Sequence, residues 1–136
     1  MTASETRRLV VERAKNRCEY CRLPQRGQAA TFHLDHILPR VEDGPDDETN
    51  LALACPTCSL RKGRKTEVLD PADGSTVGLF NPRTMTWPDH FTAREDGSVE
   101  GRTPCGRAST ACLRLNDGTL ETIRAELFAR GLWPAL

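Results

Sequence analysis

Four of the six cysteines form two pairs with the spacing of metal ligands. Two residues separate Cys18 from Cys21, and two separate Cys55 from Cys58. This spacing lets both sulfurs of a pair face one point about 2.3 Å away, so two pairs complete a tetrahedral zinc site. Four reduced buried thiols, or one redox-active pair, are the alternatives. Because four sulfur ligands leave no open coordination position, we expect the zinc to be structural.

A second group of reactive side chains lies between these pairs, in the stretch HLDHILPR at residues 33–40. It contains two of the chain's three histidines, His33 and His36, on either side of Asp35. A neutral imidazole accepts a proton near its ordinary pKa of about 6.5, and a carboxylate can hold a hard cation. The stretch therefore favours a metal site or a general base, with a chance cluster in a polar strand as the alternative. Adjacent strand residues face opposite sides, so Asp35 and His36 converge only where the strand twists or ends, and Pro39 favours an end.

Composition limits both the size of the core and the classes of function. The 136 residues are 38% hydrophobic and 5% aromatic, which predicts one domain with a thin core that bound zinc would stabilise. The net charge is zero, but basic residues gather at 7–26 and 61–65 and acidic residues at 41–48. No apolar run is long enough to span a membrane, and the charged N-terminal segment lacks a signal core. We therefore expect a cytoplasmic protein, in which thiols stay reduced.

Hydrophobic spacing and turn residues predict short elements around these groups. A first helix is expected from Ser4 to Asn16, and a strand over residues 29–38. A second helix is expected to start near residues 49–50 and to contain the second cysteine pair. Turns and loops are expected over 70–84, followed by a hairpin around Asp96-Gly97. Two helices are expected after it, one from Pro104 with Cys112 on its apolar core face and one from Thr119 to Gly131. Cys105 has no assigned role.

Taken together, these motifs resemble the HNH endonuclease family, specifically its four-cysteine branch. The resemblance rests on CEYC, HLDHILPR, Gly44, TNLALAC and CPTC followed by RKG, and it covers residues 18 to about 65. A later stretch, from LFNPR to Gly106-Arg107, is similar to an extension of bacterial members. The resemblance implies an α+β fold with a ββα-metal core, in which two antiparallel strands and a helix hold one divalent cation. We expect one domain over 1–136, with a zinc-stapled core at 1–66 and a hairpin and helical extension at 67–136 packed on it.

The resemblance also implies roles for individual residues. His36 corresponds to the general base that activates water, and Asp35 to a ligand of the catalytic cation, Mg²⁺ or Mn²⁺, with Ni²⁺ as a further candidate. Asn50 corresponds to the asparagine that restrains the loop and orients the base. Ser59 departs from the family, which has asparagine or histidine as another cation ligand there, and a neutral hydroxyl is a poorer ligand. His33, on the same strand face as Asp35, could supply a compensating imidazole, with a surface or core histidine as the alternative.

Basic residues and the third histidine are the expected substrate contacts. Members of the family cut DNA and leave a 3′ hydroxyl and a 5′ phosphate. Phosphate contacts give affinity without base discrimination, so no sequence preference is inferred. The candidate phosphate contacts are Arg40, Arg61, Lys62, Arg64 and Lys65. His90 approaches the phosphate or the cation if the hairpin folds over the site, and otherwise packs beside Trp87 and Phe91.

Three functions remain open at this stage. The first is a DNA endonuclease with a structural zinc ion. The second is a catalytically weakened scaffold that binds nucleic acid, which Ser59 favours and the intact Asp35, His36 and Asn50 oppose. The third is a structural protein whose hairpin and C-terminal helices bind an unidentified protein partner. A second metal near Asp35, distinct from zinc, would distinguish the first function from the second.

Overall fold

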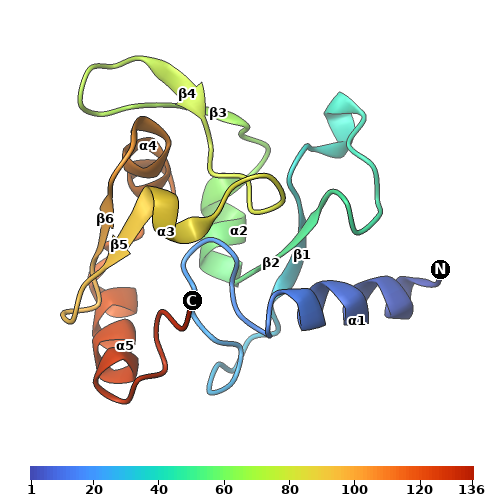
Figure 1. Cartoon of the computed structure of the whole chain (residues 1–136). Coiled ribbons are helices and arrows are strands. Elements are labelled where there is room, and N and C mark those ends of the chain that lie inside the picture. The colour runs from blue at the N-terminus through green and yellow to red at the C-terminus, as the bar shows by residue number, and fades with distance from the viewer. The chain divides into compact units, whose positions relative to one another are not determined.

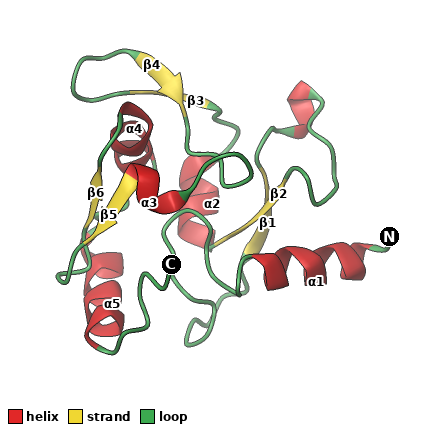
Figure 2. Ribbon diagram, viewed as in Figure 1, coloured by secondary structure: helices red, strands yellow, loops and turns green.

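A computed structural model describes the chain from Met1 to Leu136. The chain divides into two compact units, Met1–Arg64 and Lys65–Leu136. Each unit combines helices with antiparallel strands (Figures 1 and 2), which confirms the expected α+β class. The packing of the second unit on the first as one domain stays a prediction. None of the helices has the length and apolar composition that a membrane span requires.

The first unit contains a two-stranded antiparallel sheet followed by a helix. Strand β1 (His33–His36) pairs with β2 (Leu51–Ala54), which places His36 opposite Leu51. Helix α2 (Pro56–Lys62) follows β2 after a single residue. This order is the ββα arrangement that the family resemblance implies (Figure 2).

The expected start of the second helix near residues 49–50 is wrong. Residues Leu51–Ala54 form a strand in which all four side chains are buried, and the helix begins at Pro56. A short apolar run suits a strand buried on both faces, and proline at the first helical position loses no intrahelical hydrogen bond. Cys55 is the N-cap, and its sulfur accepts a hydrogen bond from the Cys58 amide at 3.4 Å. The second cysteine pair therefore lies at the junction of strand and helix.

The segments around this sheet are also shorter than expected. Helix α1 (Ala3–Arg13) is capped by Thr2, which forms a reciprocal capping box with Glu5, instead of by Ser4. Strand β1 covers only part of the expected span 29–38 and ends at His36. A 3₁₀ turn, η1 (Arg40–Glu42), and the acidic loop then return the chain to β2.

The second unit contains two hairpins and three helices. Strand β3 (Glu67–Leu69) pairs with β4 (Thr76–Gly78), and β5 (Phe91–Ala93) pairs with β6 (Val99–Gly101). The helices are α3 (Trp87–His90), α4 (Pro104–Cys112) and α5 (Gly118–Ala129). The hairpin at Asp96-Gly97 is confirmed, with a φ of 83° at Gly97, and so are the helix from Pro104 and the last helix. Strand β4 lies inside the stretch 70–84, which was expected to contain only turns and loops.

Buried polar side chains hold this unit together. Asp70 accepts two hydrogen bonds from the Arg107 guanidinium, at 3.1 and 2.7 Å, and this guanidinium lowers the pKa of Asp70. Arg124 is fully buried and donates to the Gly97 carbonyl at 2.7 Å. Cys112 is only half-buried, so its expected place in the core is wrong; the buried residues of α4 are Gly106, Ala108 and Ser109.

Candidate metal centre and active-site pocket

The four paired cysteines come together in the first unit. Cys18 and Cys21 follow α1, and Cys55 and Cys58 lie at the start of α2. Their sulfur atoms all lie within 4.8 Å of one another and are buried, and the Cys21 and Cys55 sulfurs are 3.8 Å apart. Four sulfurs at about 2.3 Å from a central zinc ion in a tetrahedron would be separated by about 3.8 Å. The cluster therefore fits the predicted zinc ion.

Backbone and neighbouring sulfurs both act on the ionisation of these thiols. The amides of Cys21 and Cys58 point at the Cys18 and Cys55 sulfurs, at 3.5 and 3.4 Å. The pKa of Cys55 is lowered by hydrogen bonds with the neighbouring sulfurs, of which the bond with Cys18 has the largest effect. The hydrogen bond with Cys18 has the opposite effect on Cys21 and Cys58 and raises the pKa of both thiols. Four sulfurs this close cannot all be thiolates without a cation, and a bound zinc ion would supply that charge.

A pocket of about 460 Å³ opens beside strand β1. Its lining includes the reactive side chains of the opening motif together with the start of the acidic loop and the end of α2; the residues are His33, Leu34, Asp35, His36, Pro39, Arg40, Val41, Ser59, Gly63 and Arg64. Because β1 ends at His36, Asp35 and His36 line one pocket although they are adjacent in sequence. The pocket thus collects one carboxylate, two imidazoles and two guanidinium groups.

Asp35 is a buried carboxylate at the wall of this pocket. It is 8% exposed, and its Oδ2 atom accepts a hydrogen bond from the Tyr20 hydroxyl at 3.1 Å. The same oxygen lies 3.1 Å from the Lys62 ammonium. Burial raises the pKa of Asp35, and the Lys62 charge opposes this shift. Both contacts involve Oδ2, so Oδ1 keeps its lone pairs for another ligand.

Lys62 differs from the surface phosphate contact that was expected. Its side chain is 1% exposed, and its ammonium binds the Asp35 carboxylate and the His36 carbonyl oxygen, the latter at 2.8 Å. A lysine stem buried along the last turn of α2 places the charge inside the unit. Lys62 therefore ties the helix to β1 and supplies the counter-charge of Asp35.

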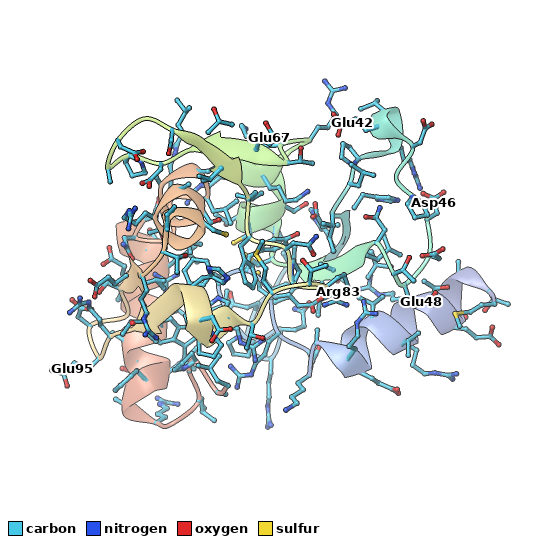
Figure 3. The ribbon with its side chains drawn as sticks, turned by 45° about the horizontal axis from the view of Figure 1, so that its top comes forward. Glu42, Asp46, Glu48, Glu67, Arg83 and Glu95 are labelled. Carbon is cyan, nitrogen blue, oxygen red and sulfur yellow. The ribbon has the colours of Figure 1, made fainter.

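The His36 ring is hydrogen-bonded to a residue that the sequence motifs did not single out. Its Nε2 atom lies 2.7 Å from Oδ1 of Asp46, in the acidic loop. The same Asp46 oxygen accepts a hydrogen bond from Nε of Arg40 at 2.8 Å. Figure 3 labels Asp46 with two further acids of this segment, Glu42 and Glu48. Asp46 lies ten residues beyond His36 in a run of similar acids, so only the loop conformation distinguishes it.

Asn50 closes the loop between the two strands. Its Oδ1 atom accepts from the Leu38 amide at 2.9 Å, and its Nδ2 atom donates to the carbonyls of Leu38 at 2.8 Å and Pro45 at 3.0 Å. Gly44 lies against this bridge, because a Cβ atom there would come within 1.8 Å of the Leu38 oxygen. The side chain of Asn50 therefore fixes both ends of the segment 38–45, which contains Arg40 and directly precedes Asp46.

Gly44→Ala is expected to disturb this bridge and to lower the free energy of unfolding by about 1–3 kcal/mol, because the added methyl group meets backbone. Thermal or urea unfolding measures the change. Gly78→Ala is the matched control, since a Cβ atom at Gly78 meets nothing within 4 Å and its φ lies outside the left-handed region. Equal stability of Gly44→Ala and wild type would contradict the tight packing at this loop.

The remaining predicted site residues lie in different environments. His33 is exposed, and its Nδ1 atom is 3.0 Å from the Ser59 hydroxyl. Ser59, which stands where the family has an asparagine or histidine ligand, is thus hydrogen-bonded to the histidine that could compensate for it. Arg64 is exposed at the rim of the pocket, while Arg61 is half-buried on α2. Lys65 is exposed and begins the second unit.

His90 belongs to the second unit and has internal partners there. Its Nδ1 atom is 2.6 Å from the Thr103 hydroxyl, and its ring contacts the edge of Phe80 with centroids 5.9 Å apart. Cys105, outside the cysteine cluster, has its sulfur 3.7 Å from the sulfur of Met85, and burial raises its pKa. These contacts supply a structural account of both residues.

Comparison with known proteins finds one family match, which lies almost wholly within the first unit. Residues 18–65 match the family model of the HNH endonuclease. No curated protein and no solved structure matches the chain. The matched segment contains both cysteine pairs, the β1–β2 sheet and α2. It gives this part of the chain a nuclease-type or nucleic-acid-binding function.

Proposed function

Because residues 18–65 carry an HNH endonuclease domain, we propose that this chain is a metal-dependent endonuclease that hydrolyses phosphodiester bonds of DNA. One observation carries the proposal: Asp35 and His36 line the same open pocket. A carboxylate for a cation and an imidazole for a proton are the two groups that hydrolysis by this family requires. The four cysteines would hold a structural zinc ion, and their reduced thiols favour the cytoplasm as the site of action.

Asp35 and His33 are the proposed ligands of the catalytic cation. The Tyr20 and Lys62 contacts of Asp35 both involve Oδ2, which leaves Oδ1 as the proposed metal-binding atom, and His33 shares the strand face and the pocket. The Nδ1 atom of His33 pairs with Ser59, so its Nε2 atom remains for a metal, as is common for ligating histidines whose other nitrogen is hydrogen-bonded. A Mg²⁺ or Mn²⁺ ion, or Ni²⁺, bound there would stabilise the negative charge that develops on the phosphate and the leaving oxygen.

His36 is the proposed general base. A ring nitrogen of its neutral imidazole takes a proton from water, whose oxygen forms the new bond to phosphorus. The bond between phosphorus and the 3′ oxygen breaks, and this oxygen takes a proton from solvent. The products are a 3′ hydroxyl and a 5′ phosphate. Asn50 supports this step by holding the loop that follows the base.

Phosphates beside the scissile bond would meet the basic rim of the pocket. Arg64 and Arg40 line the pocket and are exposed. Lys65 follows Arg64 directly, and Arg61 precedes Arg64 by three residues. Such contacts neutralise phosphate charge and make affinity fall with salt, without reading the bases. We therefore propose DNA, bound through its phosphates, as the substrate.

A nucleic-acid-binding module without catalysis is the second candidate. The observation that favours it is the Lys62 ammonium at 3.1 Å from Asp35, which already neutralises the carboxylate that a cation needs. Ser59, a neutral residue at a ligand position, acts in the same direction. Both features lower the expected affinity for the catalytic cation.

Incubation of zinc-loaded protein with supercoiled plasmid, with Mn²⁺ added or withheld, separates the two candidates. A nuclease produces nicked and linear DNA only with added Mn²⁺, and the new ends carry 5′ phosphates that allow ligation. A binding module retards the plasmid in the gel and leaves it supercoiled. Intact plasmid with Mn²⁺, at protein concentrations that retard it, would refute the nuclease.

A further inference from the structure

The contact between His36 and Asp46 determines which ring nitrogen carries the proton. The two atoms, Nε2 and Oδ1, are 2.7 Å apart. A carboxylate accepts hydrogen bonds and donates none, so the hydrogen between them belongs to Nε2. In a neutral ring with Nε2 protonated, Nδ1 holds the free lone pair. The proton acceptor of the ring is then Nδ1.

Asp46 is itself held by its neighbours. Nε of Arg40 donates to the same oxygen at 2.8 Å. The hydrogen bond from Arg40, and after it the one from His36, lowers the pKa of Asp46. The preceding residue is fixed too, because the Pro45 carbonyl accepts from Asn50 at 3.0 Å. The acceptor is therefore an ionised carboxylate at a defined position in the loop.

We propose that Asp46 is a positioning residue of this site: it holds His36 in the Nε2–H tautomer and in a fixed orientation, with Nδ1 as the atom that takes the proton. This inference rests on the proposed nuclease function. When Nδ1 takes the proton of water, the ring becomes an imidazolium, and the adjacent carboxylate stabilises that charge. The main role of Arg40 is then to hold Asp46, in addition to its expected role as a phosphate contact.

The expected effect is moderate because Asp46 is open to solvent. Its side chain is 65% exposed, so water competes for the carboxylate and weakens the pair relative to a buried one. Loss of a group that orients a functional histidine typically lowers activity by about 10–100-fold. We expect Asp46→Ala to lower kcat by about 10-fold and to leave KM within about twofold, because Asp46 acts through His36 and not on the substrate.

Two measurements on the zinc-loaded full chain test this role. ¹⁵N NMR of the histidine rings, at a pH where His36 is neutral, reports which ring nitrogen carries hydrogen, and plasmid-nicking kinetics give kcat and KM. The variants are Asp46→Ala and Asp46→Asn, whose amide oxygen can still accept from Nε2. The control is Glu42→Ala, which removes a carboxylate of the same segment that has no contact with His36. Unfolding midpoints show that all variants are folded.

We expect His36 to be protonated on Nε2 in wild type and in Glu42→Ala, and to become a mixture of tautomers in Asp46→Ala with the 10-fold lower kcat. Asp46→Asn should lie between them. An unchanged tautomer in Asp46→Ala would overturn the proposal, and so would an unchanged kcat in a variant whose tautomer has shifted. If no protein, wild type included, cut DNA, the nuclease function would fail, while the NMR spectra would still decide whether Asp46 orients His36.

Discussion

Replacement of Cys58 by serine is expected to unfold the unit Met1–Arg64 and to release its zinc. The four cysteine sulfurs are buried and lie within 4.8 Å of one another, between α1 and the β2–α2 junction. Zinc binding contributes about 10–16 kcal/mol in small zinc domains at neutral pH, which equals or exceeds the whole stability of a typical domain. Native mass spectrometry and circular dichroism measure the zinc content and the folded fraction.

Cys105→Ser is the matched control, because this thiol lies outside the cluster and contacts Met85. It should keep one zinc ion per chain and the spectrum of the wild type. Retention of zinc and of the unfolding midpoint by Cys58→Ser would contradict a zinc site at the cluster. Folded wild type that contains no zinc after purification without chelators would contradict it as well.

Asp35→Asn is expected to lower the free energy of unfolding by about 3–5 kcal/mol, besides removing a ligand of the catalytic cation. The substitution leaves the Lys62 ammonium, 1% exposed, without its counter-charge. Removal of one partner of a buried ion pair leaves an uncompensated charge, which costs about this much. Urea denaturation of the zinc-loaded proteins measures the difference.

The double variant Asp35→Asn with Lys62→Met serves as the control for this pair. It removes both charges and keeps an unbranched side chain of similar length at the buried position, so most of the lost stability should return, while Mn²⁺-dependent cleavage should not. Recovery of stability without activity would separate the structural role of the pair from the cation-binding role of Asp35. A single variant as stable as the wild type would show that Lys62 does not depend on Asp35.

The sequence predicted those parts of the molecule that local rules determine. The cysteine spacing indicated the four-sulfur cluster, and Asp96-Gly97 and Pro104 marked a turn and a helix start that the structure contains. The predicted start of the second helix was wrong because Leu51–Ala54 has no hydrophobic periodicity that distinguishes a buried strand from a buried helix. Pairing with β1 decides the matter, and this pairing is a tertiary contact.

The surroundings of the candidate site depend on contacts that no motif contains. The basic run RKGRK predicts a phosphate contact at Lys62, yet the structure buries its side chain against Asp35. Asp46 was one acid among several, and the hydrogen bonds of Asn50 to the loop bring it to His36. The family motif supplied His36, Asp35 and Asn50, whereas their partners follow from the packing of helix α2 and from the conformation of the acidic loop.

Plasmid nicking tests most directly whether the pocket beside β1 cuts DNA. The rate is measured for zinc-loaded wild type and for His36→Ala, each with Mn²⁺ added or withheld. A general base contributes about 10²–10⁴-fold to a reaction rate. We expect nicking by the wild type that requires Mn²⁺ and falls by this factor in His36→Ala, with zinc content and unfolding midpoint unchanged. Equal Mn²⁺-dependent rates for the two proteins would contradict the account.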